Sequence, residues 1–462
     1  SNNTAVGGAA LRYNTASNNT AFGRSALGAN TTGTSNVAVG YQALDANTTG
    51  NYNVACGNNT LGLNTTGDDN VAIGLDALKS NTTNGYKVAI GPHCAELDTA
   101  AGATVAIGNN CLKTNVSGVN NTGVGAQSLM LNTGSNNTAI GLNALRNNSS
   151  ASNNTAVGLQ ALLTNTTGAN NTAVGSGALQ SSTTGHHSVA VGFQALEDMT
   201  TAADNTAVGH QSGKNITTGY KNTAVGQNSL SSATTHYQNT AIGYDTLHDC
   251  TGNNNTAVGF QAGQNITSGS NNVTIGWQSA TSLTTGSRSC IIGYLVNSSG
   301  ATVGDELVVH AGNATITAFG NGTAMIGAHS AGGSAGAVYR TGNSSSWSTT
   351  SDERIKKDIT DNTDGLSIIN QIKVRNFKYR TEDEITVDSL KPYSRVDCGT
   401  ETHIGVIAQE LETVASQCVS DETTGLKSVD TDELFWIMLN AVKELSTKNT
   451  ALETRVATLE AA

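Results

Sequence analysis

A short motif repeats along the first two thirds of the chain: a Thr or Val, usually an Ala, then Val, Ile, Phe or Cys, and finally a Gly. The motif glycines of the 18 copies stand at positions 7, 23, 40, 57, 74, 91, 108, 125, 141, 158, 175, 192, 209, 226, 243, 259, 276 and 293, in steps of 17 with three steps of 16. This period is too short for a two-helix repeat, and β-branched residues bounded by Asn, Thr and Gly are typical of strands and turns. The pattern predicts a β-solenoid of 16–17-residue coils, one coil per copy.

Within each copy, side chains alternate between the two faces of the expected strand. The residues three before and one before the Gly share one face, and the Ala between them points the opposite way. We interpret the Ala as a tight contact, with another chain as the candidate neighbour. A Leu four residues after the Gly, such as Leu44, supplies a second core layer, and segments such as Asn47-Thr48-Thr49-Gly50 have turn chemistry.

The expected coil is thin, which bears on assembly. At ~4.8 Å per strand, 18 coils make a rod of roughly 85 Å. So short a coil encloses little core, and we therefore expect lateral association through the Ala face, in a homotrimer. The shaft is expected at residues 1–296. The chain opens within a repeat, so we expect a fragment or a mature piece.

The rhythm fades beyond Gly293, and residues 297–350 are expected to form a β-rich tip or connector. Tyr339, Arg340 and Trp347 stand there in a chain with only 4% aromatic residues, which makes them a candidate receptor-binding patch. A loose connector with incidental aromatics explains them equally well.

Charge places a domain boundary at Thr350-Ser351. Residues 1–350 carry 23 charged residues and residues 351–462 carry 34, and the net charge of the chain is -11. Neither part has the basic excess that a phosphate backbone demands, so we expect no nucleic acid partner. No run of 18 apolar residues occurs, and we expect no membrane insertion. The seven cysteines are scattered singly, so we expect no metal site, and we expect no cofactor.

The repeats resemble the head repeats of trimeric YadA-like adhesins. The motif Ser-Val-Ala-Ile-Gly of that family is echoed in Ser188–Gly192 and Thr104–Gly108, although the repeat of that family is shorter.

Residues 351–462 resemble the self-cleaving intramolecular chaperone domain of phage endosialidases and tailspikes, the S74 peptidase family. The resemblance rests on five segments: Ser351–Ile359, Gly365–Ile372, Asn376–Tyr379, His403–Leu411 and Lys427–Asp430. It implies a small α+β domain at 351–462 that drives trimerisation of a fibrous passenger and then cuts itself off.

The resemblance also implies a Ser-Lys dyad. Ser351 would be the nucleophile, Lys356 the base, and Thr350-Ser351 the cleaved bond. Ser351 and Lys356 are five residues apart, whereas residues on one face of a helix are three or four apart. The two side chains must therefore meet across a turn or between subunits. Taken alone, the local segment favours a solvated charged stretch over a dyad.

A terminal helix is expected after Asp430, which can cap it with Glu433 in capping-box spacing. Apolar residues then follow a 3-4 alternation that is typical of a coiled coil, with Asn449 in the seam. The seam residues are Met438, Val442, Leu445, Asn449, Leu452, Val456 and Leu459. An amphipathic helix packed on its own domain is the alternative.

These features together favour a viral or phage tail fibre or spike in the virion, which acts outside the cell. Its partners would be its own copies and a host cell-surface glycan or protein. A cellular or secreted trimeric adhesin is one alternative. A glycan-degrading tailspike is another, although acidic pairs such as Asp68-Asp69 and Glu197-Asp198 stand in turn segments, where solvated polar residues are expected. The one enzymatic activity that we expect is autoproteolysis.

Overall fold

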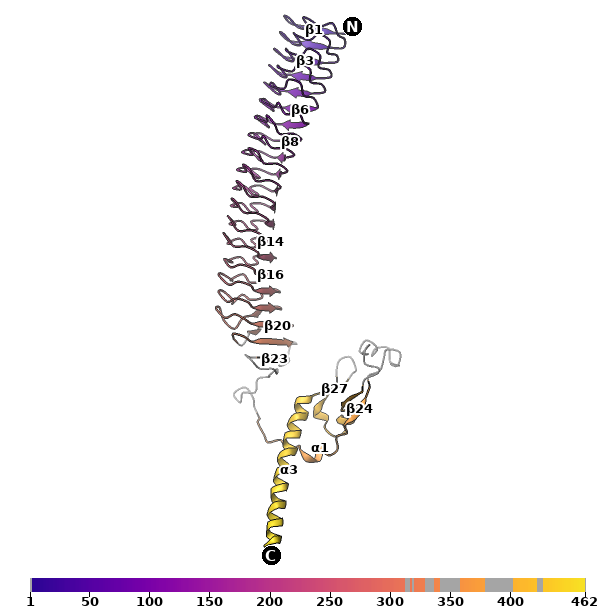
Figure 1. The fold of residues 1–462 in the computed structure, drawn as a ribbon, viewed down its shortest axis with the longest axis vertical. Coiled ribbons are helices and arrows are strands. Elements are labelled where there is room, and N and C mark those ends of the chain that lie inside the picture. Colours follow the sequence, from indigo (N-terminus) through magenta and orange to yellow (C-terminus); the bar gives the residue numbers. More distant parts are fainter. Residues whose placement is uncertain are drawn as a thin grey trace. The chain divides into compact units, whose positions relative to one another are not determined.

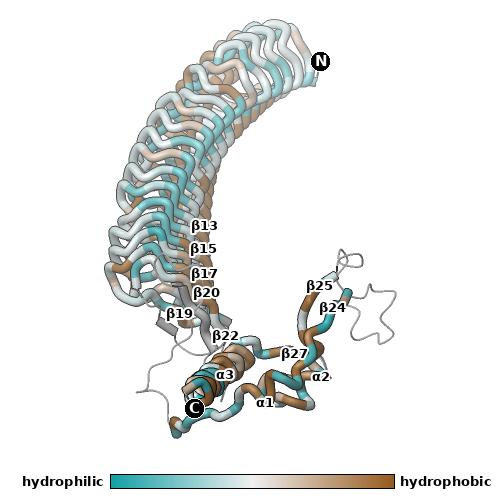
Figure 2. Tube along the Cα trace, turned by 60° about the horizontal axis from the view of Figure 1, so that its bottom comes forward, coloured by the Kyte–Doolittle hydropathy of each residue, from teal (hydrophilic) through white to brown (hydrophobic). Residues whose placement is uncertain are grey.

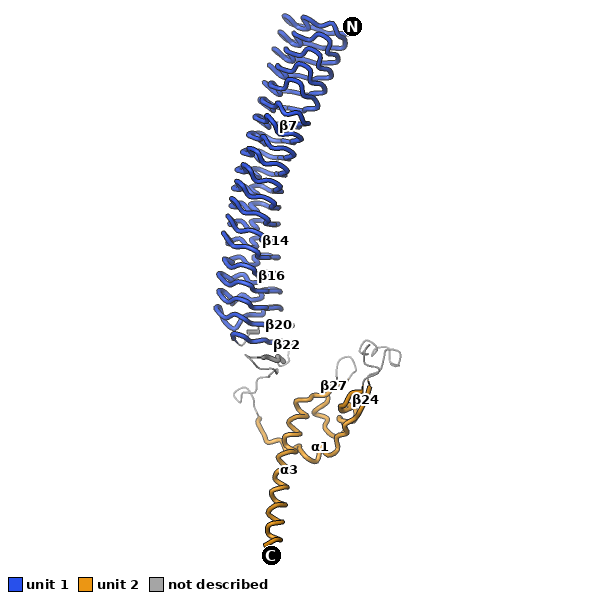
Figure 3. The backbone as a smooth tube through the Cα atoms, viewed as in Figure 1, with its two compact units in different colours: residues 1–350 blue, residues 351–462 orange. Residues whose placement is uncertain are grey.

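The structure is a computed structural model that describes residues 2–311, 316–317, 320–328, 336–340, 358–378, 402–421 and 427–461. The chain divides into two compact units, residues 1–350 and 351–462, which are coloured separately in Figure 3.

The first unit is a β-solenoid, which confirms the predicted fold class (Figure 1). Its strands are β1 (Thr4–Val6), β2 (Thr20–Phe22), β3 (Val37–Val39), β4 (Val54–Cys56), β5 (Val71–Ile73), β6 (Lys87–Ile90), β7 (Thr104–Ile107), β8 (Asn121–Val124), β9 (Thr138–Ile140), β10 (Thr155–Val157), β11 (Thr172–Val174), β12 (Val189–Val191), β13 (Thr206–Val208), β14 (Thr223–Val225), β15 (Thr240–Ile242), β16 (Thr256–Val258), β17 (Val273–Ile275), β18 (Cys290–Ile292), β19 (Val296–Asn297), β20 (Leu307–Ala311), β21 (Ile316–Thr317), β22 (Ala324–Ala328) and β23 (Gly336–Arg340). One sheet holds 21 of these strands, and all but β23 run parallel, each in register with its counterpart one coil away. The two remaining strands, β19 and β21, pair with each other.

The motif glycine closes each strand because no other residue fits there. Gly175 has a φ of +137°, and a Cβ built on it would lie 2.2 Å from the carbonyl oxygen of Gly192 in the next coil. The same close approach recurs from Gly7 to Gly293. A positive φ and backbone contact along the rod therefore both require Gly.

The Ala column faces the inside of its own coil, which corrects our prediction. Ala38, Ala173 and Ala241 are fully buried within the solenoid, whereas the residues on either side of them in the strand point outwards. The prediction of a lateral contact through Ala was wrong: in most coils the buried Leu and Asn columns leave room for little more than a methyl group there, and in β18 and β20 the same inward position holds the buried Ile291 and Val308. The recurrent Leu, as in Leu44 and Leu179, is buried as predicted.

Two columns of buried asparagines fill the rest of the coil, and the sequence analysis took one of them for turn residues. The first column stands four residues before the motif Gly: the backbone N–H of Asn36 donates to Oδ1 of Asn19 at 3.0 Å, and the step from coil to coil is repeated many times. The second stands seven residues after the Gly: Nδ2 of Asn64 donates to Oδ1 of Asn47 at 2.9 Å. Buried amides are tolerated because these ladders satisfy most of them; the side-chain oxygens of Asn81 and Asn165 are exceptions, where the next coil has Asp98 or Ser182 in place of Asn.

Side-chain sizes at two buried positions of a coil change together, so that a larger residue at one is matched by a smaller residue at the other. Where the second Asn column gives way to Ile216 or Ile266, the Leu position becomes Gly213 or Gly263, so the added aliphatic group takes the space of the Leu. A Cβ on Gly213 would lie 3.1 Å from Cδ1 of Ile216. Such paired changes are expected in a close-packed interior.

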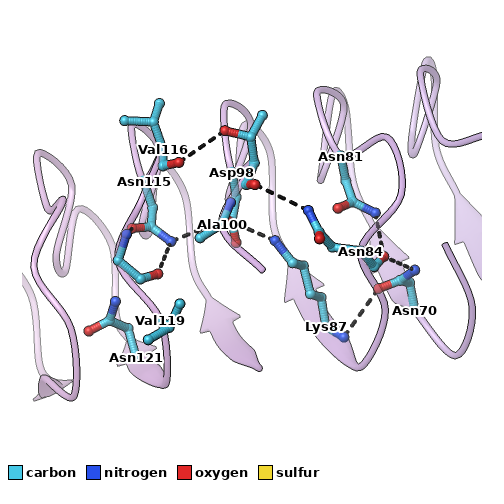
Figure 4. A network of polar contacts seen from close by, with 12 residues as sticks. Asn70, Asn81, Asn84, Lys87, Asp98, Ala100, Asn115, Val116, Val119 and Asn121 are labelled. Carbon is cyan, nitrogen blue, oxygen red and sulfur yellow. Dashed lines mark hydrogen bonds and ion pairs between the residues drawn. The ribbon is translucent and has the colours of Figure 1, made fainter. Parts of the chain in front are cut away.

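One coil replaces both asparagines by an ion pair. Lys87 and Asp98 occupy the two Asn positions of the same coil, with Nζ 2.9 Å from Oδ1 and both side chains fully buried (Figure 4). Ala95 stands at the Leu position of that coil and makes room for the longer lysine. Burial lowers the pKa of Lys87 and raises the pKa of Asp98, and the attraction between the two groups opposes both shifts.

The second unit is small and mixed. Its described elements are α1 (Leu366–Ile369), β24 (Arg375–Phe377), β25 (His403–Gly405), α2 (Ala408–Glu412), the 3-10 helix η3 (Ser416–Cys418), β26 (Val419–Asp421), β27 (Lys427–Val429) and α3 (Thr431–Glu460). The strands form two antiparallel pairs, β24 with β25 and β26 with β27. A long terminal helix after a small domain was predicted and is confirmed.

Candidate assembly site

The described residues of the second unit enclose a small core. Leu411 and Ala415 lie against Cys418 and against Ile437 of α3, with partly buried aliphatic residues such as Ile369 around them. The tight contact between α1 and α3 depends on Gly365, because a Cβ there would lie 3.1 Å from the backbone nitrogen of Ala441. This cluster anchors the first turns of α3 and leaves the rest of the helix uncovered within the described unit.

The start of α3 is set by the predicted cap. Oδ1 of Asp430 accepts hydrogen bonds from the backbone N–H groups of Asp432 at 3.0 Å and Glu433 at 3.1 Å. The carboxylates of Asp432 and Glu433 in the first turn also stabilise the helix, because they lie at the positive end of its dipole.

The predicted seam of α3 is exposed along its length. Its six apolar members are between 49% and 71% exposed, whereas Ile437 and Ala441, on another face, are the buried residues of the helix. The alternative of an amphipathic helix packed on its own domain holds for that other face only. A stripe of aliphatic side chains left in water is a surface that a second helix can cover.

Three further exposed apolar residues on α3 were missed by the sequence analysis. Phe435, Trp436 and Leu439 are exposed, and they belong to the run Leu434–Leu439, in which all six residues are apolar. Six consecutive apolar residues cover the whole circumference of a helix, which was the signal that more than one face is used.

An aromatic column on the solenoid was also missed. Tyr244, Phe260, Trp277 and Tyr294 each follow a motif Gly, and their rings stack in sequence with centroids 5.2, 5.8 and 5.0 Å apart. All four are partly exposed. Their equal spacing behind the glycines was the signal that could have found them.

One cluster in the described residues has the ligand types that a cation would need. Nδ1 of His93 lies 3.1 Å from a carboxylate oxygen of Glu96 and 3.7 Å from one of Asp76. Each carboxylate also pairs with a lysine, Lys79 or Lys113, at 3.4 Å. The arrangement is a network of charges that already compensate one another.

The predicted dyad lies outside the described residues. This holds for Thr350, Ser351 and Lys356, and also for Trp347. The backbone of Tyr339 and Arg340 belongs to β23, which pairs with β22, and their side chains lie outside the description. In the described ranges, no helix has both the length and the apolar character needed to cross a bilayer.

The first part of the second unit matches a known protein family. Residues 351–420 match the Peptidase S74 family model, the chaperone of endosialidase. The comparisons with curated proteins and with solved structures gave no match. A β-solenoid of about 19 turns followed by this chaperone domain supports a tail-fibre-like protein.

Proposed function

We propose that the chain is the shaft of a homotrimeric tail fibre or spike of a virus or phage, which attaches to a host surface and is assembled by its C-terminal chaperone domain. The observation that carries the proposal is the chaperone match directly after a long solenoid. The exposed seam of α3 supports self-association, because a single chain leaves it in water.

The chaperone domain is proposed to release itself by autoproteolysis at Thr350-Ser351. The hydroxyl of Ser351 attacks the carbonyl carbon of Thr350, and the bond to the Ser351 nitrogen breaks. Lys356 takes the hydroxyl proton and passes it to that nitrogen, which becomes the new amino terminus. Water then hydrolyses the ester between Thr350 and the Ser351 oxygen. A lysine with an ordinary pKa near 10.4 is a poor base at neutral pH, so Lys356 needs desolvation or nearby cations.

Intact mass under denaturing conditions tests this step. We expect the natural chain to yield two pieces, 1–350 and 351–462, and Ser351→Ala and Lys356→Ala to stay whole. Ser348→Ala is the matched control, because it removes a nearby serine and should still be cleaved. A natural chain that stays whole, or a Ser351→Ala chain that is still cut, contradicts the dyad.

The proposed partner outside the particle is a host cell-surface glycan or protein, with Tyr339, Arg340 and Trp347 as the candidate contacts. A glycan array read for both retention and hydrolysis tests this. Retention without hydrolysis fits the attachment fibre, and hydrolysis favours the glycan-degrading tailspike.

A further inference from the structure

The outward face of the solenoid sheet, here called the outer face, consists of the residues three before and one before each motif Gly and their equivalents in β20 and β22. Ten of the residues directly before the Gly are large apolar side chains between 37% and 57% exposed, among them Phe22, Val208 and Ile242. Figure 2 shows hydrophobic residues aligned as a stripe beside the labels of β13, β15 and β17.

The outer face is uniform in a way that its neighbours are not. Across the 20 parallel strands, the second outward position is always Val, Ile, Phe or Cys, and neither outward column contains a charged residue. The residue directly after the Gly is also exposed in many coils, yet it varies from Arg24 and Asn109 to Leu142 and Trp277. Exposed positions without a packing constraint vary in residue type, as the position after the Gly does. A sheet face that contacts water normally carries charged residues, and the outer face has none.

The size of the outer face suits a stable contact. Twenty strands at ~4.8 Å give a length of ~95 Å, and two outward side chains per strand give a width of about 7 to 10 Å. The product, roughly 650–950 Å², exceeds what monomers usually expose in one patch and is close to the ~800 Å² that each partner contributes to a standard interface.

The repeat identifies the occupant. A partner that packs against every rung must itself repeat at the strand spacing, and a second copy of this solenoid does so. The absence of charge gives no basis for selecting an acidic or basic partner, and Thr is the main hydrogen-bonding residue that a sugar would find there. We propose that copies of the chain pack along their outer faces, parallel and in register. This inference rests on the proposed trimer and names its shaft interface.

The chain carries its own probe for this contact. Cys56 lies in the outer face, at the end of β4, and its thiol is free and exposed in the single chain. Parallel copies in register would bring equivalent Cys56 side chains together.

The experiment uses the full-length Ser351→Ala chain, oxidised with copper phenanthroline and dissolved oxygen, with disulfides mapped by mass spectrometry. Two thiols lose two protons and two electrons to the oxidant. We expect a Cys56–Cys56 link, joining at most two of every three chains in a trimer. In a Cys56→Ser background, Val208→Cys should link to itself. Thr201→Cys, an exposed threonine on a bend, is the matched control and should not.

Sedimentation of the same sample separates the two proposals. An oligomer in which Cys56 does not link, or in which Thr201→Cys links equally well, overturns the outer-face contact and leaves the trimer standing. A monomer overturns both.

Discussion

The two units differ in how much of their structure a single chain completes. In the solenoid, buried Ala, Leu and Asn columns fill the coils, and the parallel strands of the main sheet pair from each coil to the next. In the described part of the second unit, a few residues around Leu411 and Ile437 are buried, and the apolar residues of the α3 seam are exposed to water. The main-sheet strands of the solenoid find their hydrogen-bond partners along its axis, whereas the seam of α3 and the outward side chains of the solenoid strands are apolar surfaces that a single chain leaves exposed. Assembly is therefore expected to depend first on α3 and then on the outer face.

The largest effect is expected from charges in the α3 seam. Leu445→Glu with Leu452→Glu should raise the dissociation constant of the assembly at least ~100-fold, because two apolar contacts are lost and two carboxylates are introduced. Sedimentation across a concentration series measures this. Thr447→Glu with Thr454→Glu, on the opposite side of the helix, is the control and should assemble normally. Equal behaviour of the two double variants would argue against the seam.

The next effect concerns the solenoid alone. Gly175→Ala should destabilise the rod by about 3–5 kcal/mol, because a positive φ and a 2.2 Å approach to Gly192 both oppose a Cβ. Denaturant unfolding followed by circular dichroism measures it. Gly8→Ala is the control, since its Cβ would meet nothing within 4 Å. A Gly175→Ala rod as stable as the Gly8→Ala rod would contradict the close-approach argument.

The buried ion pair should be replaceable as a unit. Asp98→Asn leaves Lys87 buried without its partner and should cost about 3 kcal/mol. Adding Lys87→Asn and Ala95→Leu restores the Asn and Leu columns in that coil and refills the space that the lysine occupied, so the triple variant should regain the stability of the natural chain or exceed it. Hydrogen exchange at β6 and β7 measures the local change. A triple variant less stable than Asp98→Asn would show that the pair stabilises the coil in its own right.

The smallest effect is a pH dependence at the end of the solenoid. Two hydrogen bonds from Arg288, at 2.6 and 2.7 Å, hold the pKa of Asp305 below its ordinary value of 3.8. A carboxyl with a lowered pKa stabilises the fold above its ordinary pKa and loses that contribution as the pH falls through its folded value. The protection factors of amides at β18 and β20, taken relative to the intrinsic exchange rate at each pH, should therefore fall slightly below about pH 3.8. Arg288→Gln should abolish this pH dependence, and its persistence would assign it elsewhere.

The repeat period was enough to predict the solenoid, because Gly spacing and β-branched residues report directly on strand and turn. It was not enough to orient the strand. Val and Ile are usually the buried residues of a strand, and the exclusion of Val39 in favour of Ala38 follows from a coil interior that Leu44 and Asn36 already fill. The Asn columns were missed because Asn is common in turns. The helix α3 and its cap at Asp430 were predictable from local chemistry, whereas the contact of Gly365 with α3 joins residues far apart in the sequence.

The most direct test of the proposed fibre is the molar mass in solution of the full-length Ser351→Ala chain, measured by sedimentation equilibrium at micromolar concentration. The account predicts about three times the 47.1 kDa of one chain. A folded species with the mass of a single chain would contradict it.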